Sequence, residues 1–142
     1  MQLARILIPV GGTSADPDVI RLAAAIAKPT KARVTAVHVI EVRQILPLDA
    51  VLEGELDRGE ELLAKVAKLA EEEGIKIRTE LLQAREAAAA IIDTARDWQI
   101  DLIVLGMPYR RRLGRVYVGR TVEKVYVGAP CAVLAYRQEE PK

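Results

Sequence analysis

Five short apolar runs, separated by segments with helical spacing, constrain the fold of this chain more than any other feature. The runs predict strands at residues 3–10, 33–40, 75–82, 101–105 and 130–136. The segments between them predict helices that end before Pro29 and then span residues 48–73, 86–98 and 118–127. The first run, LARILIPV, is almost continuously hydrophobic, which is typical of a parallel strand buried on both faces.

Regular alternation of strand and helix predicts βαβ units and therefore a parallel sheet. The expected fold class is α/β, a doubly wound flavodoxin-like or Rossmann-like sheet of five strands with helices on both faces. With 142 residues and no linker-like segment, the chain is expected to form a single domain over residues 1–142. Ser14 or Asp16 is the expected N-cap of the first helix.

The amino-acid composition argues against several classes of function for this chain. The formal net charge is only +1, which gives no overall attraction to nucleic acid or membranes. The single cysteine, Cys131, excludes an internal disulfide, and no cluster of Cys and His residues has metal-ligand spacing. No secretory leader and no apolar run of about 20 residues is present, so we expect a cytoplasmic protein that is not embedded in a membrane.

Glycines follow two of the predicted strands, Gly11 and Gly12 after the first and Gly106 after the fourth. Ligands of doubly wound sheets bind beyond the carboxyl ends of the strands, so these glycines are expected to share one site. The later stretch GRVYVGRT differs from a phosphate-binding P-loop only at Arg120. A P-loop must directly follow a strand, whereas the fourth strand ends well before this stretch, so the literal P-loop is rejected. Gly119, Arg120 and Thr121 still stand at a predicted helix start, which favours anions.

The chain resembles the universal stress protein family from end to end. The resemblance is carried by ILIPVGGTS, by VTAVHVI and above all by DLIVLGMPYRRRLGRVYVGRTVEKVYVGAPCAVLAYR. In that family the last region carries the pattern G-x2-G-x9-G-[ST]. The pattern aligns with this chain without gaps, and its four fixed positions correspond to Gly106, Tyr109, Gly119 and Arg120.

The resemblance implies the positions of a nucleotide site. They are Pro9, Val10, Gly11 and Val39 toward the adenosine, and Gly106, Tyr109, Gly119, Arg120, Thr121 and Val122 toward the phosphates. Three positions depart from the family's ATP-binding pattern, because Gly11 replaces an aspartate, Tyr109 a glycine and Arg120 a serine or threonine. The ATP-binding motif is therefore degenerate, and no cofactor is certain.

These departures leave two hypotheses. In the first, the ring of Tyr109 fills the phosphate path, and the protein is a regulatory dimer that has lost the family's ATP binding and acts through protein contacts. In the second, it is a stress sensor that binds ATP or another adenine nucleotide, with or without Mg²⁺, through an arginine-rich clamp. The clamp would draw on a basic loop: Arg110, Arg111, Arg112 and Arg115, together with Arg120. Two other interpretations of these arginines are a charged surface exposed to solvent and a binding surface for an acidic protein partner.

No enzyme is expected, because the only histidine, His38, has no identifiable nucleophile or carboxylate partner, and Cys131 is expected to be a small buried hydrophobe. The last strand should lie at a sheet edge, and the resemblance implies a homodimer formed near Val133. The run YRRRLGRVYVGRTV also resembles stress-protein-type domains attached to transporters, which implies a membrane transporter as a partner in trans. No nucleic-acid partner is expected.

Overall fold

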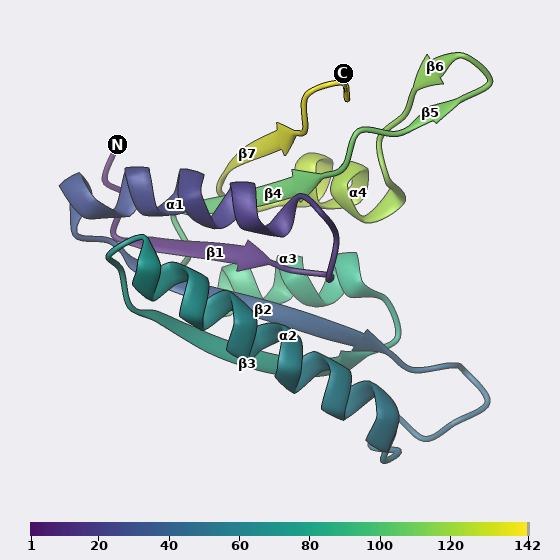
Figure 1. Ribbon diagram of the computed structural model, residues 1–142. Helices are drawn as coiled ribbons and strands as arrows, with labels where there is room; N and C mark the ends of the chain where they lie inside the picture. Colours follow the sequence, from purple (N-terminus) through teal and green to yellow (C-terminus); the bar gives the residue numbers. More distant parts are fainter. Residues whose placement is uncertain (142) are drawn as a thin grey trace.

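The centre of the molecule is a sheet of five parallel strands (Figure 1). The computed structural model describes residues 1–141. The strands are β1 (Arg5–Pro9), β2 (Arg33–Glu41), β3 (Ile77–Ala84), β4 (Leu102–Met107) and β7 (Ala132–Arg137). Their order in the sheet is β3-β2-β1-β4-β7, and every neighbouring pair is parallel. This confirms the predicted α/β class, and β7 lies at the edge as expected.

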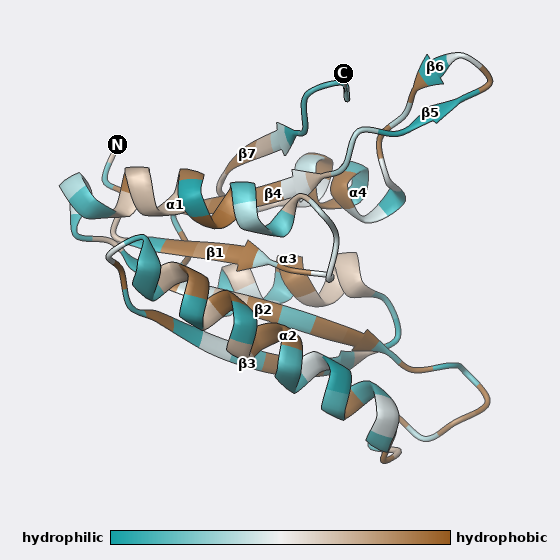
Figure 2. Ribbon diagram, viewed as in Figure 1, coloured by the Kyte–Doolittle hydropathy of each residue, from teal (hydrophilic) through white to brown (hydrophobic). Residues whose placement is uncertain are grey.

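Four helices cover the sheet, two on each face (Figure 1). They are α1 (Asp16–Thr30), α2 (Glu53–Glu72), α3 (Ala87–Asp97) and α4 (Arg120–Gly128). Along β1, Ile6 and Ile8 pack toward α1 and α2, whereas Leu7 packs toward α3 and α4. All three side chains are fully buried, each contributing about 1.5–3 kcal/mol of hydrophobic stabilisation. Figure 2 shows the hydrophobic strands enclosed by helices whose outer faces are hydrophilic.

The chain reverses its direction across the sheet at β1. From β1 it proceeds outward through β2 to β3, and it then returns so that β4 pairs with the other side of β1, with Ile6 opposite Leu102. The carboxyl ends of β1 and β4 therefore flank the topological switch point, where open α/β sheets hold their ligands.

The first helix begins and ends differently from the prediction. Its N-cap is Ala15, without a side-chain cap, and Asp16 is its first residue. The Asp16 carboxylate instead accepts a hydrogen bond from the amide of Gly12 (2.9 Å), so it organises the preceding loop. Pro29 lies inside the last turn and does not end the helix, which continues to Thr30. A proline this close to the end costs only one backbone hydrogen bond, and the Thr30 hydroxyl donates to the Ile26 carbonyl (2.8 Å).

Two other boundaries differ from the prediction because of hydrogen bonds at the ends of the elements. Helix α2 starts at Glu53 instead of residue 48, because the Gln83 amide donates to the carbonyls of Leu48 and Ala50 (3.0 Å each) and holds that segment as a turn. Strand β3 starts two residues later than predicted. The amide of Ile75 donates to the carbonyl of Ala70 (3.0 Å), so this residue completes the end of α2.

The predicted loop at residues 107–117 contains a small antiparallel hairpin. It consists of β5 (Arg111–Arg112) and β6 (Arg115–Val116), and it projects from the body of the molecule (Figure 1). Leu113 and Gly114 form its two-residue turn with φ values of +52° and +76°, as a type I′ turn requires. Among the described residues, no helix combines the length and hydrophobicity needed to cross a membrane.

Candidate functional site

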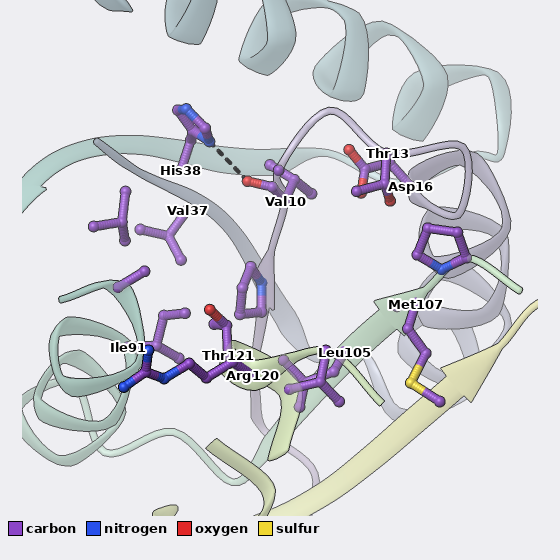
Figure 3. A pocket seen from close by; sticks show the side chains of 18 of the residues that line it. Val10, Thr13, Asp16, Val37, His38, Ile91, Leu105, Met107, Arg120 and Thr121 are labelled. Carbon is purple, nitrogen blue, oxygen red and sulfur yellow. Dashed lines mark hydrogen bonds between the residues drawn. The ribbon is translucent and has the colours of Figure 1, made fainter. Parts of the chain in front are cut away.

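A cavity of about 340 Å³ opens at the carboxyl ends of β1, β2 and β4 (Figure 3). Both glycine segments contribute to it, as the sequence predicts. The predicted nucleotide-binding residues that line it are Pro9, Val10, Gly11, Val39, Gly106, Gly119, Arg120, Thr121 and Val122. The fold therefore brings together segments that lie up to about a hundred residues apart in the sequence.

Tyr109 is not among the described residues that line the cavity. Its ring lies against the guanidinium groups of Arg111 and Arg137, which are 5.8 Å and 5.3 Å from the ring centre. Its hydroxyl also accepts a hydrogen bond from Arg111 Nε (2.6 Å). The expectation that this ring fills the phosphate path is not met, because cation–π contacts hold it toward the end of β7.

The glycines of the site serve two different purposes. A Cβ at Gly106 would collide with Val19 of α1, so this glycine permits the close packing of α1 against β4. The sequence had suggested that it admits a ligand. A Cβ at Gly11 or Gly119 would meet no atom within 4 Å, and Gly119 has φ −62°, which any residue adopts. At these two positions the fold does not require glycine, and its effect is to leave open space beside the cavity.

The start of α4 is a favourable position for an anion. Gly119 is its N-cap and makes no side-chain cap hydrogen bond, and the first-turn residues Arg120, Thr121 and Val122 line the cavity. The free amides of a first helical turn and the helix dipole both attract negative charge. Arg120 reaches the cavity from this helix, and Arg110 from the segment before β5. Within the described residues, neither arginine forms an ion pair.

The basic loop thus divides into two groups. Arg110 lines the cavity with Arg120, whereas Arg111, Arg112 and Arg115 belong to the hairpin and are exposed. On the hairpin, Arg111 Nη2 lies 3.4 Å from Glu140 Oε1, and the guanidinium of Arg112 lies 5.6 Å from the ring centre of Tyr117. The five arginines therefore do not gather into a single clamp.

Asp16 is a cavity residue that the sequence analysis missed, since it was assigned only to a helix cap. The residue is 8% exposed and lies in the cavity wall beside Thr13 (Figure 3). Burial raises the pKa of its carboxyl group, an effect opposed by hydrogen bonds from the amide of Gly12 and its neighbours. Its position four residues after Gly12, close to the end of a strand, was the available signal.

The contacts and burial of His38 and Cys131 indicate structural roles for both residues. His38 Nδ1 lies 2.8 Å from the carbonyl oxygen of Val10 (Figure 3), and because a carbonyl only accepts, Nδ1 carries the hydrogen. This bond ties β2 to the end of β1. Cys131 is half-buried, and burial is the main cause of a raised pKa of its thiol, which disfavours the reactive thiolate. No group of His, Cys, Asp and Glu within residues 1–141 could hold a metal ion.

Comparison with known proteins agrees with this geometry. Residues 3–137 match the model of the universal stress protein family. The chain is 35% identical over 140 residues to a universal stress protein of Methanocaldococcus jannaschii, covering 94% of this chain and 82% of that protein.

Two solved structures share the fold over nearly the whole chain. The universal stress protein UspA from Lactobacillus plantarum superposes with a TM-score of 0.78 at 28% identity, covering 96% of this chain and 99% of that one. A universal stress protein from Archaeoglobus fulgidus in complex with dAMP superposes with a TM-score of 0.75 at 21% identity, covering 95% and 98%. Because the family model spans almost every residue and the curated relative is similar over nearly its full length, this chain belongs to the universal stress protein family.

Proposed function

We propose that this universal stress protein is a regulatory protein that binds an adenine nucleotide in the cavity between β1 and β4. The observation that carries the proposal is the open space at Gly11 and Gly119 beside Arg110 and Arg120, two arginines that form no ion pair within residues 1–141. The sequence left loss of ATP binding as the other hypothesis. That hypothesis rested on three departures from the family's pattern, at Gly11, Tyr109 and Arg120. Of these, Tyr109 is not among the described residues that line the cavity, which supports the present proposal.

The lining of the cavity combines two kinds of chemistry. Apolar side chains, including Val10, Val39 and Ile91, offer a surface for a flat base. The first turn of α4 and the forks of Arg110 and Arg120 offer hydrogen bonds and positive charge to phosphate. The dAMP bound by the relative from Archaeoglobus fulgidus is a ligand of this kind.

Isothermal titration with AMP, ADP, ATP and cAMP, each with and without Mg²⁺, tests the proposal. We expect binding of at least one of them, weakened at least tenfold by Gly119→Ala, because the added methyl enters ligand space that no protein atom occupies. Gly54→Ala, in the first turn of α2, is the matched control, since its methyl would make only an ordinary contact of 3.5 Å with Arg58. A folded wild-type protein that binds none of the four nucleotides would overturn the proposal.

We also propose that the protein is a homodimer formed through β7 and α4. In the part of the chain that the structure describes, strand β7 pairs with β4 alone and leaves its other edge open near Val133. Beside it lies a hollow of about 470 Å³ whose lining includes the exposed residues Tyr126 and Val127 of α4, 60% and 81% exposed. An open strand edge next to an apolar surface suits a two-fold interface.

Light scattering at micromolar concentration tests the dimer. We expect twice the chain mass of 15.6 kDa for the wild-type protein and the monomer mass for Val127→Asp. Ile45→Asp is the control, because Ile45 is 85% exposed and lies on a distant loop. A monomeric wild-type protein, or a dimer that persists in Val127→Asp, would contradict this interface.

A further inference from the structure

The tip of the β5–β6 hairpin combines an apolar side chain with surrounding positive charge. Leu113 is 100% exposed, and Arg112 and Arg115 flank the turn that contains it. Figure 2 shows the turn as hydrophobic between two short strands that include hydrophilic residues. Arg111 is partly neutralised by Glu140, at 3.4 Å, whereas Arg115 has no ion-pair partner among the described residues.

The charge of the molecule is unevenly distributed around this hairpin. Residues 107–120 contain five arginines and no aspartate or glutamate, whereas the whole chain has a net charge of only +1. The remainder of the chain is therefore net acidic. In front of a negatively charged surface, such a molecule is oriented with its hairpin toward that surface and its remaining mass away from it.

The backbone conformation at the tip indicates that Leu113 does not stabilise the turn. Leu113 has φ +52°, a left-handed conformation that bulky L-residues adopt at a cost. Asparagine or glycine is the usual residue at this position of a type I′ turn. An apolar side chain is thus kept fully in solvent, at a position where a polar residue would relieve strain.

We propose that the β5–β6 hairpin docks on an anionic phospholipid surface, with Leu113 inserted below the headgroups and the neighbouring arginines bound to lipid phosphates. The hairpin presents its apolar tip first and its arginines behind the tip. When the hairpin enters a bilayer, this order places Leu113 among the hydrocarbon chains and the arginines at the level of the lipid phosphates. The paired strands are two residues each, too short to follow a nucleic-acid groove as an extended ribbon. An acidic protein surface would satisfy the arginines but would leave Leu113 without an apolar partner. The proposal does not depend on the nucleotide site.

Cosedimentation of the full chain with two kinds of vesicles tests this inference. One kind is phosphatidylcholine alone, and the other is equal parts phosphatidylcholine and phosphatidylglycerol. We expect reversible binding to the second kind only, weakening as salt is added. Leu113→Asn should reduce the partition coefficient about tenfold through loss of apolar insertion. Since Asn-Gly is a preferred type I′ pair, this variant retains the hairpin.

Matched control variants distinguish the contribution of the hairpin tip to vesicle binding from that of exposed charged or apolar residues elsewhere on the surface. Arg115→Gln should reduce binding about fivefold, which corresponds to about 1 kcal/mol per basic residue near an anionic surface. Arg78→Gln makes the same charge change on β3, and Ile45→Asn removes another apolar residue that is 85% exposed, from a distant loop, so both should bind as the wild type does. The inference is overturned if the wild-type protein ignores anionic vesicles or if Leu113→Asn binds them equally well. Tighter binding to polyglutamate or duplex DNA, unaffected by Leu113→Asn, would also overturn it.

Discussion

Ser14 and Gln138, which are 124 positions apart in the sequence, exchange two hydrogen bonds. The Ser14 hydroxyl donates to Gln138 Oε1 (3.0 Å), and Gln138 Nε2 donates to the Ser14 carbonyl (2.9 Å). The backbone amide of Gln138 also donates to the carbonyl of Met107 (3.0 Å). One residue just beyond β7 therefore fastens the loop after β1 to the end of β4, and both of these segments border the cavity.

Replacing this residue tests the importance of the connection. Gln138→Ala should lower the free energy of unfolding by about 1–2 kcal/mol, because the side chain loses its two hydrogen bonds with Ser14 and a longer one to Asp18 Oδ2 (3.4 Å). It should also weaken nucleotide binding, because the loop that carries Gly11 loses an anchor. Urea unfolding and titration measure the two effects, with Gln44→Ala, in an exposed loop, as the control. Unchanged stability and affinity in Gln138→Ala would show that the connection has no energetic role.

Gly106→Ala should destabilise the protein by about 1–3 kcal/mol, the usual cost of overpacking a core. The added methyl would collide with Val19 of α1. Adding Val19→Ala should recover part of that loss, since it removes the colliding group, so the double mutant should be more stable than the sum of the two single effects. Gly11→Ala is the matched control and should leave the thermal midpoint nearly unchanged, because its methyl meets open space. Strict additivity of Gly106→Ala and Val19→Ala would argue against this packing role.

Asp16 should make stability depend on pH. Burial raises the pKa of its carboxyl group, so the folded state holds the proton more tightly than the unfolded state does. Its contribution to stability is therefore greatest below the ordinary aspartate range and is lost as pH rises through the pKa of the folded state. The difference in unfolding free energy between wild type and Asp16→Asn should shift in favour of the variant as pH rises, which urea titrations at several pH values can measure. A difference that is constant over this range would contradict the assignment.

Gly11→Asp should strengthen nucleotide binding by about tenfold, the scale of one hydrogen bond to a charged group. The position lines the cavity and has room for a side chain, and the family's ATP-binding pattern has an aspartate there. Gly12→Asp is unsuitable as a control because Gly12 has φ +79°, so Gly54→Asp, which adds the same negative charge at an exposed position in the first turn of α2, serves as the charge control instead. Weaker binding by a folded Gly11→Asp protein would mean that the ligand occupies the cavity in another orientation.

The sequence was informative where one local pattern determines the structure. The apolar runs around Ile8 and Val104 predicted buried parallel strands, and glycines at strand ends predicted a shared cavity. Tyr109 could not be placed in this way, because its orientation depends on contacts with Arg111 and with Arg137 of β7, which no local pattern predicts. The hairpin was missed because Leu113 occupies a turn position where asparagine is the usual signal.

The place of β1 at the centre of the sheet also affects how the protein emerges from the ribosome. Strand β2 follows β1 closely in the chain, but the partner on the other side, β4, begins only at Leu102. During synthesis one edge of this buried strand therefore remains unpaired until β4 has been made, and such an edge can pair with the wrong partner. Because residues of β4 and α4 line the cavity, the cavity is complete only in the last stage of folding of a nascent chain.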